Sequence, residues 1–150
     1  MILSANPKAQ NEAYKKEIKN AINRVIDSGW YVLGKEVKSF EKEFAKYNNS
    51  KYSVGVANGT EALFLSLIAL GIKPGDEIIT SSHTAVATAS AIDLAGAKPI
   101  FVDIDTDHFT IRSDLIESAI TKKTKAIIPV HIYGQPCEMD SIKLISEKYG

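Results

Sequence analysis

From residue 52 onward, short runs of β-branched residues alternate with stretches of helical character. The pattern predicts strands at residues 52–57, 77–80, 99–104 and 125–132, each followed by a helix, at residues 60–70, 84–95, 113–120 and 141–149. Residues 9–27 and 37–47 space their apolar side chains for one helix face, which predicts two amphipathic helices ahead of the first strand. Strands that alternate with helices form a parallel sheet covered by helices. The chain is therefore predicted to have an α/β fold.

The charge balance, the lengths of the apolar runs and the cysteine count limit the partners and the cellular compartment that can be expected. The 18 basic and 18 acidic residues balance to a net charge of zero, which argues against nucleic acid or an anionic membrane surface as a partner. The sequence has no apolar run near the roughly 20 residues that a membrane-crossing helix needs. Cys137 is the single cysteine, so a disulfide within the chain is excluded. A cytoplasmic protein is expected.

Ligands of open parallel sheets bind beyond the carboxyl ends of the strands. Four segments of the sequence are expected at that edge. They are residues 58–60, 81–84, 103–105 and 131–135.

The segment Asn58-Gly59-Thr60 is the most informative of the four. A glycine between strand and helix lets the backbone approach an anion closely, and the first N–H groups of the helix then point at the anion. The same residues also suit an ordinary helix N-cap, which the spacing alone favours. The segment is neither a GxGxxG fingerprint nor a Walker loop, so a nucleotide-binding Rossmann domain is not predicted.

The other polar residues at the predicted edge argue against a hydrolase active site and against a metal site. Ser82 and His83 are adjacent and no GxSxG elbow surrounds them, which argues against a serine hydrolase. Three histidines and one cysteine match no zinc spacing, so no metal is expected. Asp103 and Asp105 fit turn formation and capping better than catalysis. His83 could lay its ring against a planar cofactor or form hydrogen bonds within its own loop.

The segments together, in this order, resemble the DegT/DnrJ/EryC1/StrS sugar aminotransferase family. The resemblance covers nearly the whole chain. It is carried by SGWYVLG at residues 28–34, FEKEFA at 40–45, VANGTEAL at 56–63, LGIKPGDEII at 70–79, GAKPIFVDID at 96–105 and TKAIIPVHIYGQP at 124–136.

The resemblance implies the large domain of the aspartate-aminotransferase fold (pyridoxal phosphate fold type I), with residues 1–150 as its N-terminal portion. It implies a pyridoxal 5'-phosphate cofactor, glutamate as amino donor, a nucleotide-diphosphate keto sugar as acceptor, and a homodimer. By position, Gly59 and Thr60 would bind the cofactor phosphate. Trp30 and Tyr31 would lie on the substrate side of the site, with His131 and Tyr133 adjacent to it.

Two departures from the family pattern concern the cofactor. Many members carry an aromatic residue that stacks on the pyridine ring where this chain has Ala85, and His83 is the nearest substitute. Residues 82–88 look most like members that make 3-amino-3,6-dideoxyhexoses from dTDP-linked 3-keto sugars, for surface polysaccharides such as lipopolysaccharide O-antigen. The family's Schiff-base lysine is expected beyond Gly150, so the chain resembles a truncated large domain, without the small C-terminal domain and inactive alone.

Three other functions are open at this point. Two belong to the same family: a 4-keto-sugar aminotransferase, and a sugar dehydratase with histidine in place of the lysine. The third is of another class, a binding or regulatory protein that keeps the domain without catalysis.

Overall fold

The computed structural model describes residues 5–150. The chain forms two compact units that divide between Gly55 and Val56. None of the helices in residues 5–150 is both long and apolar enough to span a bilayer. The two units are described separately.

The described residues of the first unit, 5–55, form the helices α1 (Pro7–Ser28) and α2 (Lys35–Tyr47). Asn6 caps α1 by accepting a hydrogen bond from the Ala9 N–H at 3.1 Å. Arg24 on α1 donates two hydrogen bonds to the carboxylate of Glu36 on α2, at 2.8 and 3.1 Å. This forked ion pair raises the pKa of Arg24 and lowers that of Glu36, chiefly through its hydrogen bonds. Both predicted helices are present: α1 begins two residues earlier and ends one residue later than predicted, and α2 begins two residues earlier and ends at the predicted residue.

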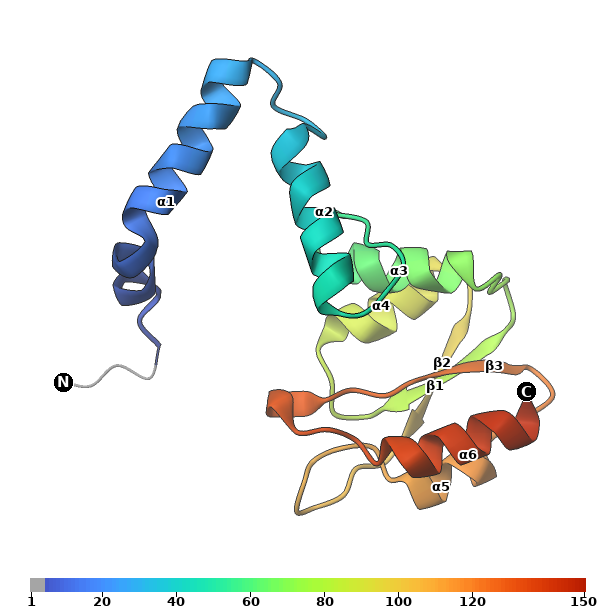
Figure 1. Ribbon diagram of the computed structural model, residues 1–150. Coiled ribbons are helices and arrows are strands. Elements are labelled where there is room, and N and C mark those ends of the chain that lie inside the picture. Colours follow the sequence, from blue (N-terminus) through green and yellow to red (C-terminus); the bar gives the residue numbers. More distant parts are fainter. Residues whose placement is uncertain (1–4) are drawn as a thin grey trace. The chain divides into compact units, whose positions relative to one another are not determined.

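The second unit is a three-stranded parallel sheet with helices on both faces (Figure 1). The strands lie in the order β2-β1-β3. The elements are α3 (Gly59–Ala69), β1 (Glu77–Ser81), α4 (Val86–Leu94), β2 (Lys98–Val102), α5 (Ser113–Ala119), β3 (Thr124–Ile128), the 3-10 turn η1 (Ile132–Gly134) and α6 (Met139–Tyr149). The predicted α/β class is confirmed for this unit.

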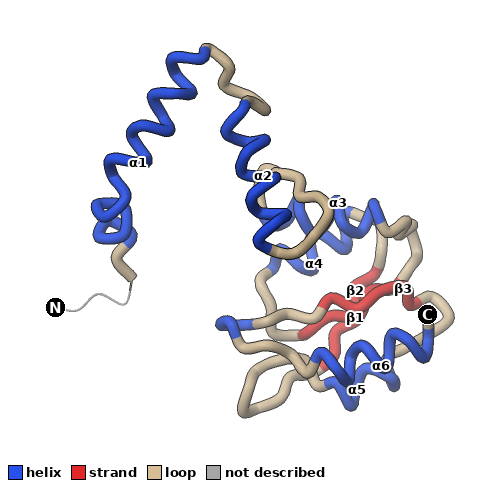
Figure 2. The backbone as a smooth tube through the Cα atoms, in the orientation of Figure 1, coloured by secondary structure: helices blue, strands red, loops and turns tan. Residues whose placement is uncertain are grey.

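Two neighbouring residues of the central strand show why the unit has three layers. Adjacent strand residues point to opposite faces of a sheet. Ile78 packs with Leu67 and Ile92 from α3 and α4, whereas Ile79 packs with residues of α5 and α6 on the other face. Both isoleucines are fully buried. Figure 2 shows the same arrangement, with two helices on each side of the strands.

The predicted strand at residues 52–57 is wrong, because this segment pairs with no strand in the described part of the chain. Tyr52 and Val54 are about three-quarters exposed, at 75% and 76%. The Gly55 N–H donates to a carboxylate oxygen of Glu41 at 2.8 Å instead of to a neighbouring strand. A β-branched sequence favours an extended backbone, but a strand also needs a ladder partner.

The sheet has two different outer edges. On β2, the Lys98 N–H donates inward to the Asp76 carbonyl at 2.8 Å, so the following residue, Pro99, faces outward. Proline has no N–H, so this edge lacks a donor there. The outer edge of β3 contains no proline within Thr124–Ile128.

Candidate functional site

Three loops and one helix start meet at the carboxyl edge of the sheet. The strands end at Ser81, Val102 and Ile128, and because they are parallel the loops that follow them emerge at one edge. Helix α3 leads through a short turn into the start of β1, so it runs antiparallel to the strands and begins at their carboxyl edge (Figure 1). The start of α3 therefore lies at this edge although no strand precedes it.

Two side-chain-to-backbone hydrogen bonds cap the N-terminus of α3. The Asn58 side chain accepts a hydrogen bond from the Glu61 N–H at 2.9 Å, and the Glu61 carboxylate accepts one from the Ala57 N–H at 2.8 Å. The predicted N-cap role of this segment is confirmed. The N–H groups of Gly59 and Thr60 belong to the first helical turn, where the helix itself supplies no acceptor.

Space at the helix start suits an approaching anion. A Cβ built on Gly59 would meet no atom within 4 Å, so the backbone here faces open space. Thr60 is half-buried next to it and can add its hydroxyl to the two N–H groups. The helix dipole favours negative charge at this end. A phosphate-binding role for Gly59 and Thr60 stays a prediction, and the geometry is compatible with it.

His83 follows β1 and is fixed at its backbone and at its ring. Its N–H donates to the Ser81 hydroxyl at 3.1 Å, and its carbonyl accepts from the same hydroxyl at 3.2 Å. Its ring atom Nε2 lies 3.0 Å from the Tyr133 hydroxyl, across 50 residues of sequence. The structure thus brings together two of the predicted site residues. The predicted loop hydrogen bonds of His83 are present, and its stacking role stays a prediction.

Phe109 completes an aromatic cluster with His83 and Tyr133, and the sequence did not single it out. Its ring centroid lies 6.4 Å from that of His83 and 6.5 Å from that of Tyr133, and the latter pair meets edge to face. The His83 and Tyr133 centroids are 5.8 Å apart. Each strand loop therefore contributes one ring, and all three separations suit aromatic pairs.

Asp105 builds the turn that presents Phe109. Its carboxylate accepts hydrogen bonds from the N–H groups of Asp107 and His108 at 2.9 and 2.8 Å. These two bonds, with a side-chain bond from His108, lower the pKa of Asp105. The turn role predicted for Asp103 and Asp105 is confirmed, since the Asp103 carboxylate accepts from the Ile104 N–H at 2.8 Å. The sequence Asp-Thr-Asp signals such a turn, but no local signal shows which ring it presents.

His131 is anchored from one side and exposed on the other. Its Nδ1 accepts a hydrogen bond from the Cys137 N–H at 3.1 Å, so the neutral ring carries its proton on Nε2. The Cys137 thiol donates to the Val130 carbonyl at 3.1 Å. Burial raises the pKa of this thiol. The predicted strand here ends at Ile128 instead of residue 132, because residues 132–134 turn into η1, where Tyr133 has a φ of 56°.

Trp30 and Tyr31 belong to the first unit, within the connector between α1 and α2. Each is 68% exposed. The Trp30 indole N–H donates to the Val32 carbonyl at 2.6 Å, so the indole offers a ligand its ring face. Both residues line a cavity of about 800 Å³ in this unit.

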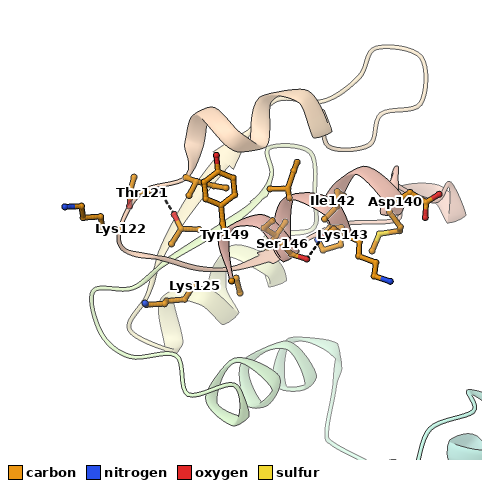
Figure 3. Close-up of a pocket in the computed structure, with 16 residues that line it drawn as sticks. Thr121, Lys122, Lys125, Asp140, Ile142, Lys143, Ser146 and Tyr149 are labelled. Carbon is orange, nitrogen blue, oxygen red and sulfur yellow. Dashed lines mark hydrogen bonds between the residues drawn. The ribbon is translucent and has the colours of Figure 1, made fainter.

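A larger cavity, of about 940 Å³, lies on the outer side of β3. It runs along the outer edge of β3 and against α6, with Lys122, Lys125 and Tyr149 in its lining (Figure 3). The two lysines stand at the amino end of β3, so they are remote from the loops that follow the strands. Those loops, residues 82–85, 103–112 and 129–138, contain no lysine. Among residues 5–150, no group of three or more acidic, histidine or cysteine side chains is arranged to hold a metal ion.

Comparison with known proteins identifies the family. Residues 12–150 match the DegT/DnrJ/EryC1/StrS aminotransferase family. The chain belongs to this family. A curated DegT-family relative, the dTDP-3-amino-3,6-dideoxy-alpha-D-galactopyranose transaminase of Aneurinibacillus thermoaerophilus, is 50% identical over 139 residues. The match covers 93% of this chain and 38% of the relative, so the chain spans less than half of that protein's length.

Solved DegT-family structures share the fold. DesV of S. venezuelae, in complex with a ketimine intermediate, superposes with a TM-score of 0.94 at 45% identity, over 97% of this chain and 39% of that one. NtdA of Bacillus subtilis, with bound cofactor PMP, superposes with a TM-score of 0.88 at 37% identity, over 91% of this chain and 32% of that one. The parallel sheet flanked by helices is thus the family's fold.

Proposed function

We propose that this DegT-family chain is the N-terminal portion of the large domain of an enzyme that uses pyridoxal 5'-phosphate to transfer an amino group from glutamate to a nucleotide-linked keto sugar. The family match over residues 12–150 carries the proposal. We further propose that the enzyme works in the cytoplasm as a homodimer. Its product would serve amino-sugar biosynthesis, including surface polysaccharides such as O-antigen.

The residues at the carboxyl edge fit the cofactor. A phosphate needs several donors, positive potential and close access to the backbone. The N–H groups of Gly59 and Thr60, the dipole of α3 and the open space at Gly59 supply these. A planar ring needs an apolar or π face, and His83 in the aromatic cluster offers one at the same edge.

The bound cofactor would act as an electron sink that carries the amino group between the two substrates. The chain's own residues would orient both partners. Gly59 and Thr60 would fix the phosphate, and His83 would lie against the ring and exclude water from one face. Trp30 would offer its ring face to the sugar nucleotide, with Tyr31 beside it. His131, whose Nε2–H points away from its anchored Nδ1, and Tyr133 would contribute polar contacts to substrate.

A lysine from outside this sheet edge would have to bind the cofactor covalently. The loops that follow β1, β2 and β3 contain none. We therefore propose that residues 1–150 alone carry out no transamination and that the complete gene product is required. Noncovalent binding of the cofactor to residues 1–150 would not require that lysine.

The preferred substrate is a dTDP-linked 3-keto-6-deoxyhexose. Residues 82–88 and the name of the relative that is 50% identical both support it. The full-length gene product, given pyridoxal phosphate and glutamate, should convert this sugar to the 3-amino sugar with release of one 2-oxoglutarate per turnover. Mass spectrometry of the sugar nucleotide measures the conversion.

Two control substrates make the assay decisive. Conversion of the 4-keto isomer alone would favour the 4-aminotransferase. Loss of a sugar hydroxyl without uptake of glutamate nitrogen would indicate the dehydratase. No reaction with any keto sugar, in a protein that is folded, would contradict the proposal and favour a regulatory role.

A further inference from the structure

The aromatic cluster of His83, Phe109 and Tyr133 is not part of the hydrophobic core. Phe109 is 45% exposed and Tyr133 80% exposed, whereas the core residues around β1 are almost fully buried. Rings gathered at the protein surface gain less from burial than core residues do. Packing of the core therefore does not explain why three separate loops bring their rings to one place.

Two of the three rings are held on unfavourable backbone. Phe109 has a φ of 60° and Tyr133 a φ of 56°, in the left-handed region that residues with a Cβ rarely adopt. Hydrogen bonds fix the Phe109 turn. Its N–H donates to the Asp105 carbonyl at 2.9 Å, and the Asp105 N–H donates to the Thr110 carbonyl at 2.9 Å. Such conformations persist only where the surroundings impose them, and they gather at functional sites.

The geometry around His83 shows what the third ring adds. The backbone of His83 is bound to the Ser81 hydroxyl, and its Nε2 to the Tyr133 hydroxyl at 3.0 Å. A ring fixed at those two ends can still swing about the line that joins them. The Phe109 ring, inclined at 55° to the imidazole, supplies a contact off that line. Because Phe109 meets Tyr133 edge to face at 82°, the three rings brace one another.

We propose that Phe109 is a positioning residue that, with Tyr133, sets the tilt of the His83 ring at the carboxyl edge. The tilt would match the plane of the cofactor ring, and this purpose rests on the proposed function. Phe109 itself does not contact the cofactor; it acts through His83.

The test replaces Phe109 in the full-length gene product. Phe109→Gly removes the ring and relieves the left-handed backbone, since glycine adopts positive φ freely. Phe109→Tyr keeps a ring and is the conservative rescue. Phe101→Leu is the matched control, because it removes an exposed phenylalanine on β2 that lies outside the cluster.

The first readout needs no cofactor. With 13C-labelled histidine, the His83 ring signals, assigned by their loss in His83→Gln, report the neighbouring rings. Phe109→Gly should shift these signals and weaken the contacts between His83 and Tyr133, with no loss of melting temperature. Phe109→Tyr and Phe101→Leu should leave them close to wild type. Unchanged His83 signals in Phe109→Gly would overturn the positioning role.

The second readout is titration with pyridoxal phosphate, followed by its visible absorbance. Phe109→Gly should bind it roughly two- to tenfold more weakly, the range of one lost aromatic contact. Shifted His83 signals with unchanged affinity would overturn the link to the cofactor. If the wild-type protein binds no pyridoxal phosphate, the proposed function fails, and the His83 signals alone decide whether Phe109 sets the tilt.

Discussion

Replacing Gly59 with alanine separates the stability of the fold from the binding of the cofactor. In the structure the new methyl group would meet no atom within 4 Å, and Gly59 does not have a positive φ. Alanine also loses less backbone entropy than glycine in a helix, so the free energy of unfolding should rise by up to about 1 kcal/mol. In the proposed site, the same methyl group would stand where the cofactor phosphate approaches the backbone.

Affinity for pyridoxal phosphate should therefore fall although the protein becomes no less stable. Losing one charge-assisted hydrogen bond is worth about 1.5–3 kcal/mol, which is roughly a ten- to hundredfold loss of affinity. Titration of the full-length gene product, followed by the visible absorbance of the cofactor, measures the affinity. Urea denaturation measures the stability.

The other end of α3 provides the matched control. Gly71 has a φ of 78°, and the N–H groups of Gly71 and Ile72 bond back to the Ile68 and Leu67 carbonyls in a Schellman motif. Gly71→Ala should lower stability by about 1–2 kcal/mol and leave cofactor affinity unchanged. Wild-type affinity in Gly59→Ala would refute the phosphate assignment, and a loss of stability there would refute the open geometry.

Three further predictions concern the fold and the loops of the second unit. Ile79→Ala should lower the free energy of unfolding by about 2–5 kcal/mol in urea denaturation, because it empties space in the α5–α6 core; a change under 1 kcal/mol would contradict that packing. Hydrogen bonds hold the pKa of Asp105 below its ordinary value of 3.8, so the carboxylate stabilises the turn above that pH and the stabilisation is lost as pH falls through the lower, folded-state pKa. Amide exchange at His108, corrected for the intrinsic pH dependence, should speed up below pH 3.8 in the wild type, and an equal increase in Asp105→Asn would contradict this. Cys137 should react slowly with a thiol reagent at neutral pH, because burial raises its pKa and leaves little thiolate; the rate of a free thiol would refute its burial.

The alternation of β-branched and helical segments was enough to predict β1, β2 and β3 and the helices between them. Period-2 and period-3.6 patterns depend on burial against the sheet, and residues such as Ile78 and Ile79 carry that signal locally. The segment 52–57 has the same β-branched character, but its strand would need a partner that the described chain does not place beside it. Propensity predicts an extended backbone and does not predict pairing.

The candidate site was predictable only where its signal is local. The cap formed by Asn58 and the turn formed by Asp105 depend on residues two to three positions apart, so the sequence shows them. The contact between His83 and Tyr133 spans 50 residues, and the sequence pointed to both residues without showing that they meet. The sequence did not reveal Phe109, because the position of its ring depends on a left-handed backbone at that residue. The presence of a phenylalanine in a loop does not predict that conformation.

The two edge strands of the sheet differ in their capacity to pair with a further strand. Pro99 removes a donor from the outer side of β2, so a further strand would find an incomplete ladder there. The outer side of β3 contains no proline within Thr124–Ile128, so it keeps its backbone donors beside the 940 Å³ cavity. A segment that extends this sheet would therefore find a more complete hydrogen-bonding ladder at β3 than at β2. For the 150-residue chain in concentrated solution, the same open edge is the place where strand-to-strand aggregation would begin.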